Sequence, residues 1–157
     1  MKEGENANIE NSILPNMGKT MKALDYFIAD KLKENGFELT KVQLILLKNL
    51  KYQDGQPQNN LAHLTNRDKA SLARLLTTME KKNLVARIPS KSDHRINNIH
   101  ITKHGDDMLK QAGPIFLDII RIIQEGIPKK DIDVVIRTLK KISQNINSEE
   151  LVAPLTK

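Results

Sequence analysis

Arginine and lysine side chains, which bind polyanions, are concentrated in one part of this 157-residue chain. Residues 67–103 hold nine basic and three acidic side chains, and this excess of six equals the net charge of the whole chain. The remaining residues carry equal numbers of acidic and basic side chains. A positive excess confined to one segment is typical of a polyanion binder, whereas basic residues that serve only solubility need not cluster.

A helix with one polar and one apolar face is predicted at the start of this segment. Leu72, Leu75, Leu76 and Met79 share the face that we expect to be buried. The opposite face carries Lys69, Ala70, Ser71, Arg74, Thr77 and Thr78. Small residues near its N-terminus would let this helix approach base edges closely.

Arg74 is the predicted base reader, because a guanidinium can bind a guanine edge through two hydrogen bonds. Ser71, Lys69 and Thr77 are expected to contact phosphates or to read a base less decisively. The alternative for Arg74 is an exposed arginine that pairs with a glutamate or with nothing.

Two short runs rich in β-branched residues, 84–88 and 97–101, predict an antiparallel hairpin with a basic tip. Asp93 and Arg95 lie two residues apart in the turn, so the carboxylate can orient the guanidinium for entry into an AT-rich minor groove. Arg87 and Lys91 are expected to contact phosphates from the hairpin. The alternative is a surface ion pair that contributes little.

The segments before residue 67 predict three helices. Apolar residues three and four apart predict an amphipathic helix that Asn35-Gly36 ends. Thr40 and Gln43 form a capping box for a buried helix that closes at Asp54-Gly55. Pro57 is expected to begin a short third helix that ends near Thr65, and Asn66 suits the tight turn that follows it.

Three residues predict where helices begin and end in the second half of the chain. Asp68 is a good N-cap for the helix from residue 69, and Asn83 suits the left-handed conformation where that helix ends. Thr102 is the expected N-cap of a long helix, which we expect Gly113-Pro114 to bend. A last amphipathic helix follows Pro128.

The predicted fold is therefore mainly α with a small β-hairpin wing, a winged helix-turn-helix with about six helices. We expect a flexible arm over 1–15, a winged helix-turn-helix DNA-binding domain over 36–102 and a loose tail over 148–157. Residues 16–35 and 103–147 are the expected dimerisation region, because their apolar stripes are too long for one small module to bury.

The pattern resembles the MarR family of dimeric winged-helix transcription regulators from about Met17 to Asn145. The resemblance is most specific in Leu61-Ala62, Asp68-Lys69-Ala70-Ser71-Leu72, Met79 to Val85, Ser92-Asp93-His94-Arg95 and Ile101-Thr102-Lys103-His104-Gly105. Two positions depart from it. Asn83 stands where the family usually has glycine, and Arg67 where an apolar residue is more common.

The resemblance implies a homodimer on a pseudo-palindromic operator, acting as a repressor that a small-molecule effector releases. The candidate lining residues of an effector pocket are Met21, Tyr26, Tyr52, Phe116 and Ile120. Methionine and aromatic residues at helical spacing are also typical of an ordinary core.

Other functions are less well supported by the residues. The chain has no cysteine, which excludes thiolate sites, and we expect neither a cofactor nor enzymatic activity, since no catalytic motif is present. His100 and His104 leave a metal-responsive regulator as one alternative, although they straddle a strand end and a helix start, and no metal site is predicted. A protein-interaction adaptor is a second alternative function, but such domains usually lose the basic face.

We expect a cytoplasmic protein, since no signal peptide or membrane span is present.

Overall fold

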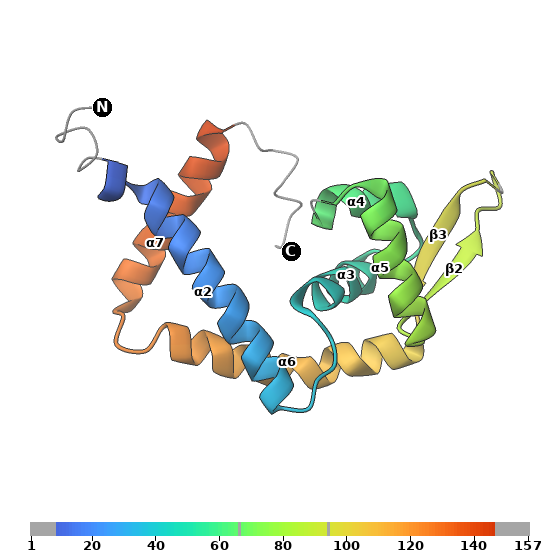
Figure 1. Ribbon diagram of the computed structural model, residues 1–157, viewed down its shortest axis with the longest axis horizontal. Coiled ribbons are helices and arrows are strands. Elements are labelled where there is room, and N and C mark those ends of the chain that lie inside the picture. Colours follow the sequence, from blue (N-terminus) through green and yellow to red (C-terminus); the bar gives the residue numbers. More distant parts are fainter. Residues whose placement is uncertain (1–8, 66, 94, 147–157) are drawn as a thin grey trace. The chain divides into compact units, whose positions relative to one another are not determined.

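The computed structural model describes residues 9–65, 67–93 and 95–146 and shows the predicted mainly helical fold with a small sheet (Figure 1). The described elements are α2 (Ile13–Glu34), α3 (Lys41–Tyr52), β1 (Gln56–Pro57), α4 (Gln58–Thr65), α5 (Lys69–Lys81), β2 (Val85–Pro89), β3 (Asn97–Ile101), α6 (Lys103–Ile123) and α7 (Lys129–Asn145). The chain divides into two compact units at residue 41, and each is described by itself.

The first unit contains α2, which begins earlier than its sequence pattern indicated. Pro15 lies in the first turn of this helix, where proline is tolerated because its missing N–H would have no helical acceptor. The prediction of a flexible arm is therefore wrong for residues 13–15. The predicted end of the helix is confirmed, since Gly36 has a φ of 72° and its N–H donates to the Lys33 carbonyl at 2.9 Å.

Apolar side chains from three helices and the sheet form most of the core of the second unit. The predicted inner face of α5 is confirmed, because Leu72, Leu76 and Met79 are buried. The other fully buried side chains of this unit are Leu46, Leu47, Leu50, Leu61, Leu84, Val85 and Ile99. This core fixes which face of α5 remains available to solvent.

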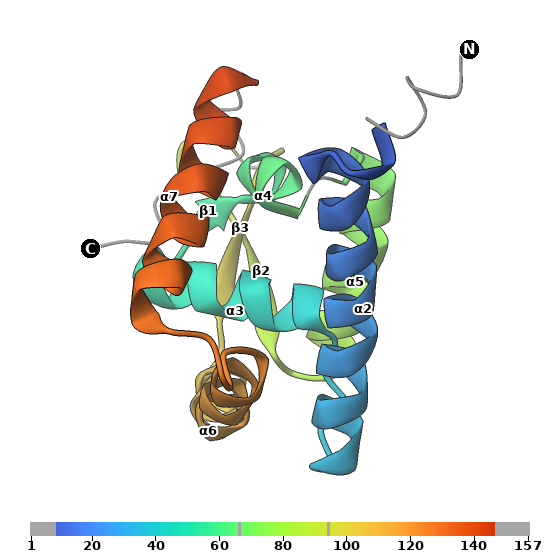
Figure 2. The same ribbon diagram turned by 90° about the vertical axis from the view of Figure 1, so that its left-hand side faces the viewer.

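The predicted hairpin is confirmed, but the sheet contains a third strand. Its strand order is β1-β3-β2, and all pairs are antiparallel (Figure 2). Pro57 does not begin a helix as predicted. It lies in β1, where it pairs with Asn98 of β3, and α4 begins one residue later. Proline suits this position because an edge strand can spare one N–H donor.

The predicted caps around the hairpin are also confirmed. Asn83 has a φ of 54°, and the Thr102 hydroxyl accepts a hydrogen bond from the Gly105 N–H at 2.9 Å. A β-carbon on Gly105 would lie 2.2 Å from the Leu84 carbonyl oxygen, so α6 can start here only with glycine at this position. α6 continues through Pro114 without a break.

The last helix differs from the other helices of the second unit because none of its residues is buried. Its exposed large apolar side chains are Val134, Val135, Ile136 and Leu139. Within the described residues, no helix is long and apolar enough to cross a membrane.

Candidate nucleic-acid interface

The N-terminus of α5 is held by Asp68, whose carboxylate makes two hydrogen bonds to one residue. One oxygen accepts from the Ser71 backbone N–H at 2.9 Å, and the other from the Ser71 hydroxyl at 2.7 Å. The hydrogen bonds from the side chain and then the backbone of Ser71 hold the pKa of Asp68 below its usual value, and the charge of Arg74 adds to them. Asp68 is therefore an N-cap, as predicted, and also orients a side chain of the outer face.

Arg74 lies exposed on that outer face, and a hydrogen bond directs its guanidinium toward the start of the helix. Its Nη2 donates to the Ser71 hydroxyl oxygen at 3.1 Å. The only proton of this hydroxyl is donated to Asp68, so its oxygen is available as an acceptor. Lys69 and Ala70 are also exposed. The structure thus brings Lys69, Ala70, Ser71 and Arg74 together at one end of α5.

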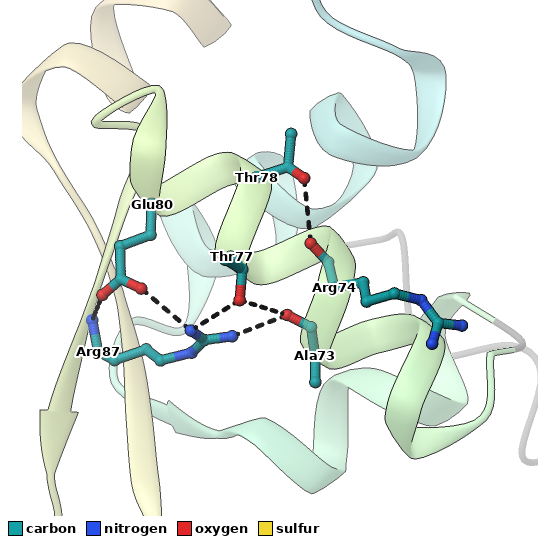
Figure 3. A network of polar contacts seen from close by, with 6 residues as sticks. All are labelled: Ala73, Arg74, Thr77, Thr78, Glu80 and Arg87. Atoms are coloured by element: carbon teal, nitrogen blue, oxygen red, sulfur yellow. Dashed lines mark hydrogen bonds and ion pairs between the residues drawn. The ribbon is translucent and has the colours of Figure 1, made fainter.

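Thr77 is exposed as well, but its hydroxyl is occupied within the protein (Figure 3). It donates to the Ala73 carbonyl at 2.9 Å and accepts from Nη1 of Arg87 at 3.1 Å. Thr78, one residue on, donates to the Arg74 carbonyl at 3.1 Å. The predicted contact of Thr77 with DNA would compete with these two bonds.

Arg87 does not extend into solvent from the wing, which we define as β2, β3 and the turn between them. Its side chain folds back onto α5, where Nη1 lies 3.0 Å from Glu80 and Nη2 donates to the Ala73 carbonyl at 2.9 Å (Figure 3). Only 20 % of this side chain is exposed. The predicted phosphate contact would require these bonds to break.

At the tip of the wing, Asp93 holds the backbone of the turn. Its carboxylate accepts from the Arg95 backbone N–H at 2.9 Å, and among the described residues no ion pair joins it to the Arg95 guanidinium. The expected orientation of that guanidinium by Asp93 is therefore not what the structure shows. Arg95 and Lys91 are exposed, while His94 lies outside the described residues.

His100, on β3, and His104, at the start of α6, belong to no group of metal-ligating side chains among the described residues. The His100 Nδ1 lies 2.9 Å from the Asp54 carboxylate, which also accepts from the Ile101 N–H at 2.8 Å. Burial alone raises the pKa of Asp54, but the hydrogen bonds from Ile101 and His100 outweigh it and lower that pKa. His104 is exposed on α6. Within the part of the chain that the structure describes, no three His, Cys, Asp or Glu side chains gather to hold a metal ion.

The residues predicted for an effector pocket come from both units. Met21 and Tyr26 lie on α2, Tyr52 ends α3, and Phe116 and Ile120 lie on α6. Phe116 is half-buried, and the other four are exposed. The pocket itself stays a prediction.

Sequence reasoning did not find two residues that shape this interface, Ala73 and Glu80. Both act by binding Arg87. One signal was present for Glu80: an acidic residue in the last turns of a helix precedes, by seven positions, an arginine in the strand that follows. No side-chain pattern could have revealed Ala73, because it contributes a backbone carbonyl.

Solved structures with this fold include several transcription regulators. CouR, described as a transcriptional repressor bound to a 23-mer DNA duplex, is 19% identical with a TM-score of 0.79, over 91% of this chain and 98% of that chain. AbsC, a MarR family transcriptional regulator from Streptomyces coelicolor, is 22% identical with a TM-score of 0.76, over 95% and 98%. An uncharacterized SlyA-like transcription regulator from Listeria monocytogenes is 23% identical with a TM-score of 0.75, over 90% and 93%.

The family comparison coincides with the candidate interface. The family model for MarR matches residues 39–96, which run from the start of α3 through α5 and the tip of the wing. This part of the chain contains the exposed face of α5, β2 and the basic tip of the wing. This winged helix-turn-helix segment, residues 39–96, is therefore a MarR family domain.

Proposed function

We propose that this protein binds a specific sequence of double-stranded DNA and regulates transcription. The observation that carries the proposal is the outer face of α5, on which Lys69, Ala70 and Arg74 are exposed beside a basic wing. A helix fits the major groove, where each base pair presents a distinct pattern of donors and acceptors. Arg74 binds a guanine edge there, and Ser71 holds its guanidinium in place.

The wing supplies the second contact in this proposal. Arg95 enters the adjacent minor groove, where a narrow AT-rich segment attracts a guanidinium, and Lys91 binds a phosphate. The Asp93 carboxylate fixes the turn through the Arg95 backbone N–H at 2.9 Å, so it presents Arg95 without neutralising its charge.

We further propose that the protein acts as a homodimer. The exposed apolar residues of α7 form a surface that water solvates poorly, and a second copy can cover it. Two copies would place two α5 helices on half-sites roughly 10 base pairs apart on a pseudo-palindrome. The 23-mer duplex that CouR binds is long enough for two such half-sites.

Repression by occupancy of the operator, with release by a small-molecule effector, is the proposed mode of regulation. It is supported by the description of CouR as a transcriptional repressor. A ligand can release the DNA only if it binds one spacing of the two helices better than the other.

Selection of bound duplexes from a random DNA pool tests the central claim. A pseudo-palindrome with a guanine in each half-site is the expected result, and binding should weaken steeply with salt, as expected for phosphate contacts. Recovery of no enriched sequence, or binding that salt does not affect, would contradict sequence-specific recognition and favour a protein-interaction adaptor.

A further inference from the structure

Arg87 joins the wing to α5 through both its side chain and its backbone. Its Nη1 donates to the Thr77 hydroxyl at 3.1 Å and to Glu80 at 3.0 Å, and its Nη2 donates to the Ala73 carbonyl at 2.9 Å (Figure 3). The other oxygen of the Glu80 carboxylate accepts from the Arg87 backbone N–H at 3.4 Å. Three residues of one helix thus hold one residue of the wing.

The Arg87 guanidinium faces these partners within the protein, and little of its side chain faces solvent. The side chain is 20 % exposed, and its Nε is buried with no hydrogen-bond partner among the described residues. The Glu80 carboxylate lies against it, so the pair adds little net positive charge for a polyanion. These features distinguish Arg87 from Lys91 and Arg95, which are exposed at the tip of the wing.

The position of Arg87 along β2 gives the contact its importance. Val85 is buried and Ala86 half-buried, whereas from Ile88 outward the described residues of the wing up to Asn97 are exposed, apart from the half-buried Ser90. Ala73 and Thr77 lie one turn apart on α5, on either side of Arg74. Arg87 therefore fixes the outer part of the wing to the segment of α5 that carries the proposed base reader.

We propose that Arg87 is a positioning residue, which sets the angle between α5 and the wing and does not itself bind phosphate. This inference rests on the proposed function, since the angle matters only if α5 and the wing enter two grooves of one duplex. A wing held at the correct angle before binding avoids the loss of conformational freedom that a mobile wing would suffer on the DNA.

The dependence of binding on salt separates a positioning residue from a phosphate contact. Arg87→Met should weaken binding to the selected duplex about tenfold, as expected when a few side chains must be ordered on binding. The slope of log K against log salt should stay that of the unsubstituted protein. Lys91→Met is the matched control, and its slope should fall by about 1. A fall of about 1 in Arg87→Met would overturn the proposal.

Glu80→Met provides a test of opposite sign. It removes a negative charge near the DNA and frees Arg87, so affinity should rise if Arg87 can bind phosphate. If Arg87 is a positioning residue, affinity should fall severalfold because the wing is no longer fixed. Circular dichroism and thermal melting confirm that each variant is folded, and tighter binding by folded Glu80→Met would contradict the proposal.

A measurement without DNA keeps this inference separate from the proposed function. The chain has no cysteine, so Lys69→Cys and Lys91→Cys provide two defined sites for spin labels, one on α5 and one on the wing. Labelled protein diluted with unlabelled protein should give a narrow distance distribution, which Arg87→Met should broaden. An unchanged distribution would overturn the proposal even if the protein binds DNA. Failure of the unsubstituted protein to bind any duplex would instead contradict the proposed function.

Discussion

The helices α5 and α7 both have an amphipathic sequence pattern, but the apolar face of α5 is buried and that of α7 is largely exposed. Leu76 on α5 is 0 % exposed, whereas Leu139 on α7 is 41 % exposed. The face of α5 is covered by the core of its own chain, which leaves its polar face free for DNA. On α7 no residue is buried by the part of the chain that the structure describes, so we expect a partner to cover this face. An amphipathic pattern predicts a helix without specifying what buries its apolar side.

Truncation of matched leucines should give the largest contrast between the two helices. Leu76→Ala leaves a cavity in a packed core and should lower the free energy of unfolding by about 2–5 kcal/mol. Leu139→Ala should cost much less when measured on the monomer in dilute solution. Urea denaturation of both variants checks this, and equal losses would show that α7 is buried within its own chain.

A charged residue introduced on the apolar face of α7 should prevent two copies from associating without unfolding the chain. Ile136→Lys should dissociate the proposed dimer, because an ammonium group that is buried without a partner loses its hydration at a cost of several kcal/mol. Light scattering should then report a monomer, and affinity for a two-half-site duplex should fall. Lys140→Glu, on the exposed surface of the same helix, is the control. A variant that remains dimeric would remove α7 from the proposed interface.

The polar face of α5 provides the next effect. Arg74→Ala should weaken binding to the selected duplex by about 1–3 kcal/mol, the typical loss for a two-bond contact to guanine, and relax the preference at one base pair. Its melting temperature should not change, because the side chain is exposed. Loss of affinity that is the same for every base at each position would mean that Arg74 binds phosphate.

Ser71→Ala should reduce the preference for guanine by less than Arg74→Ala does. The backbone N–H of residue 71 still donates to the Asp68 carboxylate in this variant, so α5 stays capped. The guanidinium of Arg74, however, loses the hydroxyl oxygen that accepts its hydrogen bond at 3.1 Å. We expect a loss of about 1 kcal/mol, typical of one hydrogen bond, confined to the position that Arg74 reads. Thr78→Ala removes a hydroxyl from the same helix without touching that guanidinium and should leave the preference intact.

The features that the sequence could predict are local, and those that it missed depend on distant partners. Asp68, Asn83 and Thr102 were identified because a cap depends on neighbours within three residues. β1 was not predicted, because a strand of two residues is too short to show an alternating pattern. The spacing of Asp93 and Arg95 is compatible with a side-chain pair and with a carboxylate that holds a backbone N–H, and the structure has the second. The partners of Arg87 lie up to fourteen positions away, on another element.

The N-cap of α5 should produce the smallest effect, visible in the pH dependence of stability. Hydrogen bonds from Ser71 lower the pKa of Asp68 in the folded protein, so their contribution is present above the unfolded pKa of about 4 and is lost as pH falls through the lower folded value. Asp68→Asn keeps a capping oxygen but cannot titrate. Asp54 and Asp106 also have lowered pKa values and titrate in both proteins. The difference between the two curves of melting temperature against pH therefore isolates Asp68: the unsubstituted protein should lose more stability on acidification, and parallel curves would show that its carboxylate charge does not stabilise α5.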